Sequence, residues 1–171
     1  LAALEKSNLI REYTPFGENV PKYKVIDPFC VFYLKHVKGN TGSPNYWQIS
    51  GKSPSVISWM GLAFEDLCWS HIRQIKRALG IEGVITKESP WHIPSDPMHS
   101  GSAIDLIINR DDRYICMCEM KFTRGLFEVK KSYNTSLQNR ANLVQEIIGA
   151  SKTVLSVLVT TYGLKRNEYS S

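Results

Sequence analysis

The fold of this chain is decided by residues 102–121, which read SAIDLIINRDDRYICMCEMK. Two largely apolar runs flank residues 109–112, Asn-Arg-Asp-Asp, a composition typical of a hairpin turn. We therefore predict two antiparallel strands, over residues 102–109 and 113–121. An acid, Asp105, interrupts the first strand, so the apolar pattern is broken by a side chain that is costly to bury alone.

The second strand ends in Glu119 and Lys121, whose side chains project from one face because they are two residues apart. Ile115 and Met117 continue that face into the core, and the opposite face carries Cys116, Cys118 and Met120. The turn between the strands brings Asp105 within reach of Glu119. The sequence thus predicts two carboxylates and one lysine at the same end of the sheet.

A helix is predicted upstream, from about Ser55 to Leu79, with Gly80 as its stop. Its apolar positions are Met60, Phe64, Leu67, Cys68, His71, Ile72, Ile75 and Leu79. Glu65 lies on a stripe with Gly61, Cys68 and Ile72, so we expect its side chain to face inward or to lie at the boundary.

The remaining elements complete an α-β-β-β-α-β order. A strand is expected over residues 83–88, followed by a loop that contains Pro90, Pro94 and Pro97 together with His92 and His99. An amphipathic helix is expected near residues 135–150, with apolar positions Leu137, Leu143, Val144, Ile147 and Ile148. The last strand, residues 153–161, is a continuous apolar run typical of a central position in a covered sheet.

Residues 1–38 are predicted to form one small unit. A helical tail over residues 1–7 precedes two extended runs, 8–14 and 22–26, on either side of a glycine-containing turn. Asp27 and Pro28 then start an aromatic helix, as a capping acid and a first-turn proline do. This order is typical of the end of a winged helix, although a plain hairpin that packs on its neighbour explains it equally.

In the winged-helix interpretation, Arg11, Lys22 and Lys24 would meet a phosphate backbone. Residues 39–56 are rich in Gly, Ser, Asn and Pro and are predicted to be a linker, with a second domain over residues 57–171. The chain starts at Leu1 in what reads as the middle of a helix, which favours a fragment of a longer protein.

The charge is unevenly distributed along the 171 residues. Residues 121–171 hold eight basic and three acidic side chains, which is the whole net charge of +5. Lys130 and Lys131 could contact a phosphate there, and Tyr133 could stack on a base. A solvated basic face is the alternative. Four cysteines without a Cys-x-x-Cys pair, no secretory signal and no membrane-spanning run favour reduced thiols in a cytoplasmic protein without a membrane partner.

Glu65, Asp105 and Glu119 together with Lys121 indicate metal-assisted chemistry. Oxygen ligands in small number suit Mg²⁺ or Mn²⁺, and a nearby lysine can orient a water or offset charge developing on a phosphate. The alternative is a structural ion pair at a strand end, since Glu-x-Lys alone is a weak signal.

The residues Ile104-Asp105, Glu119-Met120-Lys121 and the helical Gly61-Leu-Ala-Phe-Glu65 resemble the PD-(D/E)xK nuclease superfamily. More narrowly, the chain from Trp59 to Leu164 resembles the C-terminal region of archaeal-type AAA ATPases found in archaea and bacteria. There a P-loop ATPase domain precedes a winged helix and a nuclease-like domain. Ala103-Ile104 stands where the superfamily's name implies a proline.

This resemblance implies an α/β fold with a restriction-endonuclease-like α-β-β-β-α-β core and a mixed sheet, preceded by a partial winged-helix remnant. It implies that Glu65, Asp105, Glu119 and Lys121 are catalytic and that Asp105, Glu119 and Glu65 bind the metal. The expected activity is phosphodiester hydrolysis, on DNA rather than RNA, beside the ATPase domain of the parent chain.

Two alternatives stay open at this point. A non-catalytic module would dock nucleic acid, through Arg11, Lys22, Lys24, Lys130 and Lys131, or would dock a partner of that ATPase. A structural or homo-oligomerising domain would use the carboxylate cluster only for ion pairs, and it would have no useful affinity for nucleic acid.

Overall fold

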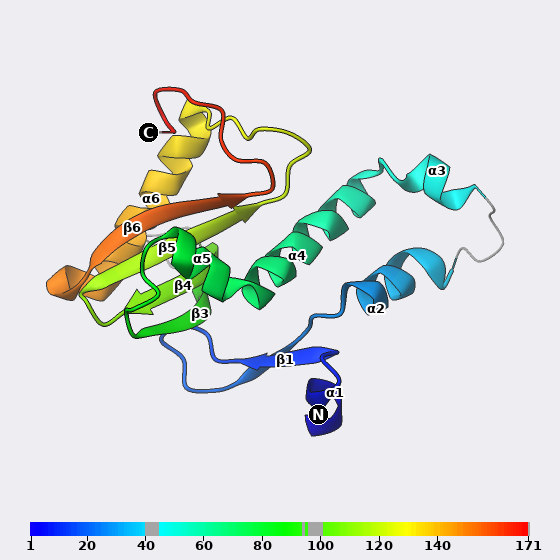
Figure 1. Ribbon diagram of the computed structural model, residues 1–171, viewed down its shortest axis with the longest axis horizontal. Coiled ribbons are helices and arrows are strands. Elements are labelled where there is room, and N and C mark those ends of the chain that lie inside the picture. The colour runs from blue at the N-terminus through cyan, green and yellow to red at the C-terminus, as the bar shows by residue number, and fades with distance from the viewer. Residues whose placement is uncertain (40–44, 94, 96–100, 171) are drawn as a thin grey trace.

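The protein, described by a computed structural model over residues 1–39, 45–93, 95 and 101–170, has a mixed α/β fold with two sheets (Figure 1). The main sheet has the strand order β3-β4-β5-β6, and a separate two-stranded sheet pairs β1 with β2. The strands of the main sheet are β3 (Thr86–Ile93), β4 (Ser102–Arg110), β5 (Tyr114–Lys121) and β6 (Thr153–Thr160).

The main sheet is mixed because its connections differ in length. The β3–β4 and β4–β5 pairs are antiparallel, whereas β5 and β6 are parallel and joined by the long crossover helix α6 (Lys131–Ile148) and the short 3₁₀ turn η2 (Gly149–Ser151). Within the described part of the chain β6 pairs only with β5, so the expected central position for this strand is wrong. Leu155 is accordingly 39% exposed.

Helices cover both faces of the main sheet, as the alternation along β5 predicts. On one face, α4 (Pro54–Ser70) and α5 (Ile72–Ala78) pack over Cys116, Cys118 and Met120. On the other, α6 packs over Ile115 and Met117. Figure 1 shows α6 behind the sheet and α4 extending away from its other side.

The predicted helix from Ser55 to Leu79 is two helices. The chain bends at His71, whose φ of −112° is not helical, and His71 is exposed rather than part of the apolar stripe. Ser53 caps α4 by accepting a hydrogen bond from the amide of Val56. Gly80 ends α5 with a φ of +68°, as predicted.

Strand β3 is longer than the sequence indicated, because it continues through Pro90 to Ile93. The ladder shifts register between Ser89 and Trp91, and such an irregularity on an edge strand tolerates a proline. His92 therefore lies in a strand rather than in the expected loop. His99 and two of the loop prolines, at positions 94 and 97, lie outside the described residues.

The N-terminal elements follow the predicted order. They are α1 (Ala2–Lys6), β1 (Ile10–Tyr13), β2 (Lys22–Val25), α2 (Pro28–Phe32) and a π-helical turn, η1 (Tyr33–Val37). Asp27 caps α2 through a 2.6 Å hydrogen bond from the amide of Cys30. The expected linker contains a short helix, α3 (Tyr46–Ser50), and loses its last residues to α4.

The β1–β2 hairpin is docked on the main sheet. The amide of Phe16 donates to the carbonyl of Pro90 at 2.9 Å, and the Phe16 and Trp91 rings lie 4.8 Å apart. The segment therefore forms a hairpin that packs on the sheet and, through the Lys24–Asp66 ion pair, on α4, and the winged-helix interpretation stays a prediction.

Two smaller expectations concern cysteines and membranes. The four cysteines are free thiols, and three of them are buried, as predicted. Among the described residues, no helix combines the length and the apolar character needed to cross a bilayer.

Candidate functional site

Asp105 lies where the ladder between β4 and β5 stops. The last paired residues are Leu106 and Cys118, and one step beyond them Asp105 Oδ2 accepts a 2.8 Å hydrogen bond from the amide of Met120. The side chain thus replaces a backbone acceptor that the diverging strands no longer provide. On the other side, Trp69 Nε1 donates to the Asp105 carbonyl at 3.2 Å, which ties β4 to α4.

The register shift explains how an acid fits in this apolar strand. Ile107 pairs with Ser89 and Ile104 with Trp91, so β4 holds one more residue than β3 over this interval. Ile104 and Ile107 consequently both join the core on the α6 face. The carboxylate of Asp105 is half-buried instead of fully enclosed.

Glu119 is the most deeply buried charged residue of the site, with 1% of its surface exposed. Its Oε1 accepts from Arg140 Nη1 at 2.5 Å, and its Oε2 lies 3.4 Å from Lys121 Nζ. Burial is the main cause that raises the pKa of Glu119. The charge of Asp105 raises this pKa further, and Arg140 and Lys121 lower it.

Arg140 is the site residue that the sequence prediction missed. It belongs to α6 and stands three residues after Leu137 and four before Val144, both of which pack on the sheet. A cation on the apolar stripe of a helix was the available signal, because a buried cation requires a buried anion opposite it.

Glu65 brings a third carboxylate to this end of the sheet. It is half-buried on α4, as its helical stripe predicted. Burial first, and then the charge of Asp105, raise the pKa of Glu65 to about 7. Asp105 therefore acts electrostatically on both glutamates, and the sequence-predicted quartet of Glu65, Asp105, Glu119 and Lys121 is gathered in one region.

Replacing Glu65 with glutamine is expected to change how stability depends on pH. The folded chain keeps the Glu65 proton between its ordinary pKa of 4.5 and about 7, whereas the unfolded chain releases it, so stability falls as pH rises through this window. Partial exposure and nearby lysines limit the effect to on the order of 1 kcal/mol. Urea unfolding at about pH 5 and about pH 8 should show a smaller difference for Glu65→Gln. An unchanged difference contradicts the assignment.

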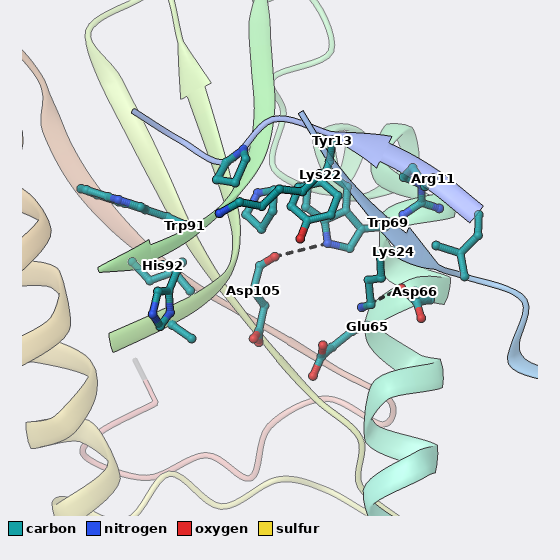
Figure 2. A pocket seen from close by; sticks show the side chains of 15 residues that line it. Arg11, Tyr13, Lys22, Lys24, Glu65, Asp66, Trp69, Trp91, His92 and Asp105 are labelled. Atoms are coloured by element: carbon teal, nitrogen blue, oxygen red, sulfur yellow. Dashed lines mark hydrogen bonds and ion pairs between the residues drawn. The ribbon is translucent and has the colours of Figure 1, made fainter. Parts of the chain in front are cut away.

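A cavity of about 310 Å³ opens beside Asp105 and Glu65 (Figure 2). Its walls come from the β1–β2 hairpin, α4, β3 and β4. They comprise Arg11, Tyr13, Pro15, Lys22, Lys24, Ile26, Glu65, Asp66, Trp69, Pro90, Trp91, His92, Ala103, Ile104 and Asp105. Figure 2 shows the carboxylates of Asp105 and Glu65 directed toward one another at one side of this cavity.

The three hairpin cations predicted to contact phosphate line this cavity. Lys24 Nζ forms a 2.9 Å ion pair with Asp66, and Arg11 Nη2 donates to the Ser70 hydroxyl at 3.3 Å. Lys22 is the most exposed of the three, and its Nζ lies 2.8 Å from the carboxylate of Glu18 in the loop between β1 and β2.

The other predicted cations lie elsewhere. Lys130 and Lys131 are exposed at the start of α6 and do not line the cavity. Tyr133 is half-buried, its ring lies 5.2 Å from that of Phe127, and burial raises its pKa to about 12. Stacking of Tyr133 on a base stays a prediction, and the side chain that would do so already packs on Phe127.

A divalent cation would find few protein ligands at this site. Among the described residues, no group of three or more His, Cys, Asp or Glu side chains is close enough to hold an ion. Mg²⁺ commonly binds through one or two carboxylates and keeps several waters. The half-buried Asp105 and Glu65, whose like charges repel each other, could supply these one or two carboxylates. Glu119 has part of its charge offset by Arg140.

Comparisons with known proteins add little to this geometry. No protein-family profile matches the chain, and no curated protein does. The crystal structure of AF1548, a protein of unknown function, resembles part of it with a TM-score of 0.38 and 18% identity. That likeness covers 56% of this chain and 47% of AF1548, so the match spans about half of that protein, and it carries no argument about function.

Proposed function

We propose that this chain is a metal-dependent nuclease-like domain that hydrolyses phosphodiester bonds. The observation that carries the proposal is the gathering of the four side chains of the quartet. Asp105 Oδ2 accepts a hydrogen bond from the amide of Met120, which lies between Glu119 and Lys121 in the chain, and Lys121 Nζ is 3.4 Å from Glu119. Asp105 and Glu65 line the same cavity. Three elements, α4, β4 and β5, supply these groups. Carboxylates whose pKa values are raised by burial and by a neighbouring carboxylate cluster at functional sites.

The proposal places the chain in the PD-(D/E)xK superfamily, on a restriction-endonuclease-like core. The helix–three-strand–helix–strand order from α4 to β6 and the quartet's positions support this placement. The hairpin would then be the remnant of a winged helix, and the whole would be the C-terminal part of a larger AAA-type ATPase. DNA is the proposed substrate.

Each member of the quartet has a role in this reading. Asp105 and Glu119 would hold Mg²⁺ or Mn²⁺, and Glu65 would bind the ion directly or through water. The bound ion would polarise a phosphoryl oxygen and supply hydroxide near neutral pH. Lys121 would orient the attacking water or offset the charge that develops on the phosphate. Arg140 limits the charge of Glu119 and holds its carboxylate in place.

A second candidate is a nucleic-acid-binding or partner-docking module without catalysis. The Arg140–Glu119 ion pair favours it, because a carboxylate neutralised by arginine has less need of a metal. This candidate predicts nucleic-acid affinity that falls steeply with salt and survives chelation of divalent ions.

Isothermal titration of Mn²⁺ into the chain and into Asp105→Ala tests the nuclease proposal. We expect the wild type to bind Mn²⁺ and the variant to bind at least about tenfold more weakly, because Asp105 is the carboxylate that lies near both Glu65 and Glu119. Asp111→Ala is the matched control, since Asp111 is an exposed acid in the turn of the same hairpin. Equal Mn²⁺ affinity in the wild type and Asp105→Ala contradicts the proposed site.

Cleavage is measured on labelled DNA and RNA with Mg²⁺ or Mn²⁺. Hydrolysis that requires the ion and Asp105 supports the enzyme. Binding of DNA that persists in EDTA, without cleavage under any of these ions, favours the docking module instead.

A further inference from the structure

The cavity beside Asp105 and Glu65 is walled by aromatic side chains from three different elements. Tyr13 comes from β1, Trp69 from α4 and Trp91 from β3. The indole of Trp69 is held in place, because Nε1 donates to the Asp105 carbonyl and the Arg11 guanidinium lies 5.8 Å from the ring centroid. The walls are thus suited to a flat, apolar group, and their geometry exists before any ligand arrives.

The wall formed by the hairpin is fixed to the sheet. The 2.9 Å hydrogen bond from the Phe16 amide to the Pro90 carbonyl, and the contact between the Phe16 and Trp91 rings, hold the hairpin against β3. A volume of about 310 Å³ is at the lower limit of small-molecule sites, which suits a single ring system with its substituents.

Charges of both signs surround the aromatic walls. The hairpin supplies Lys22, Lys24 and Arg11, and α4 and β4 supply the carboxylates of Glu65 and Asp105. The Lys24 ammonium lies beside Glu65 and pairs with Asp66 (Figure 2). The cations suit a phosphate group, and the aromatic rings suit a base. An inorganic anion would leave the apolar walls unused, and an uncharged aromatic molecule would leave the cations unused. A nucleotide uses both.

We infer that this cavity receives one unpaired nucleotide of a nucleic-acid strand, with its base against Tyr13 and Trp69 and its phosphate toward Lys22. A base inside a duplex cannot enter a walled cavity, so the strand must be single or the base must be turned out of the stack. This inference rests on the proposed function for the adjacent carboxylates, and it assigns them a single-stranded or flipped-out substrate.

Binding is tested in EDTA at low ionic strength, so that neither metal nor cleavage is required. The probe is a short single-stranded oligodeoxythymidine. Its binding is followed by the anisotropy of an end label and by the total tryptophan fluorescence, to which Trp69 and Trp91 contribute. We expect Tyr13→Ala and Lys22→Gln each to weaken its binding by about fivefold or more. A blunt duplex of the same length should bind more weakly than the single strand, with little change in either variant.

Lys165→Gln is the matched control, because Lys165, like Lys22, is an exposed lysine paired with a glutamate, and it lies outside the cavity. Its single-strand affinity should remain within about twofold of the wild type. If Lys22→Gln and Tyr13→Ala bind the single strand as the wild type does, or if the duplex competes as well as the single strand, the inference is overturned.

The two proposals fail in different ways. If the chain binds single strands through Tyr13 and Lys22 but never cleaves them, the nuclease proposal is wrong and the cavity assignment stands. If the wild type and Tyr13→Ala cleave duplex DNA equally well, the nuclease proposal stands and the cavity assignment is wrong.

Discussion

Arg140→Met is expected to lower the free energy of unfolding by about 2–4 kcal/mol. The substitution leaves Glu119, which is 1% exposed, without its 2.5 Å ion-pair partner. Lys121 at 3.4 Å compensates only in part, so the loss is somewhat smaller than for a fully isolated buried charge. Urea denaturation followed by circular dichroism measures the change.

The raised pKa of Glu119 sets the direction in which the stability of Arg140→Met depends on pH, and a substitution of Glu119 provides the control. Its raised pKa should rise further without Arg140, so the Arg140→Met variant should lose more stability as pH increases above the ordinary carboxyl pKa of 4.5. Adding Glu119→Gln should recover most of the lost stability. Arg73→Met, at an exposed arginine of α5, should stay within about 0.5 kcal/mol of the wild type. A stable Arg140→Met variant would show that Glu119 is solvated or neutral.

In the proposed nuclease, Lys121→Met is expected to reduce the rate of phosphodiester hydrolysis by about 10²- to 10³-fold. The ammonium lies beside Glu119 at the end of β5 and is half-buried, so methionine keeps the packing of the aliphatic stem while removing the charge. Mn²⁺ affinity should change by less than about tenfold, because lysine is not a metal ligand here. Single-turnover cleavage and titration calorimetry separate the two effects.

Lys87 provides the control for Lys121, since it is an exposed lysine on β3. Lys87→Met should cleave like the wild type. A Lys121→Met variant that retains the full rate would mean that the Glu119–Lys121 pair is structural.

Local pattern was sufficient to predict most of the elements. Alternation along residues 114–121 correctly divided β5 between two helical layers, because side chains on a strand alternate whatever surrounds it. Capping by Asp27 and the positive φ of Gly80 are likewise local properties, which depend on a few adjacent residues. The inward position of Glu65 followed from helical periodicity in the same way.

Tertiary contacts decided the features that sequence pattern missed. The helix break at His71, the extension of β3 through Pro90 and the edge position of β6 depend on what each segment packs against. Arg140 lies on the apolar stripe of α6, which indicates that its side chain points inward. Its partner, Glu119, lies 21 residues away on β5, so the pairing could not be predicted from the helix alone.

The sequence by itself determined which charged side chains interrupt the apolar elements and which face of each element they occupy, because these depend only on residue type and backbone period. Only the tertiary structure decided that Asp105 accepts from the amide of Met120, that Glu119 pairs with Arg140 and that the hairpin lines a cavity beside Asp105 and Glu65. The physical reason is that hydrogen-bond partners, burial and pKa shifts are set by distances between elements, and those distances exist only after the chain has packed.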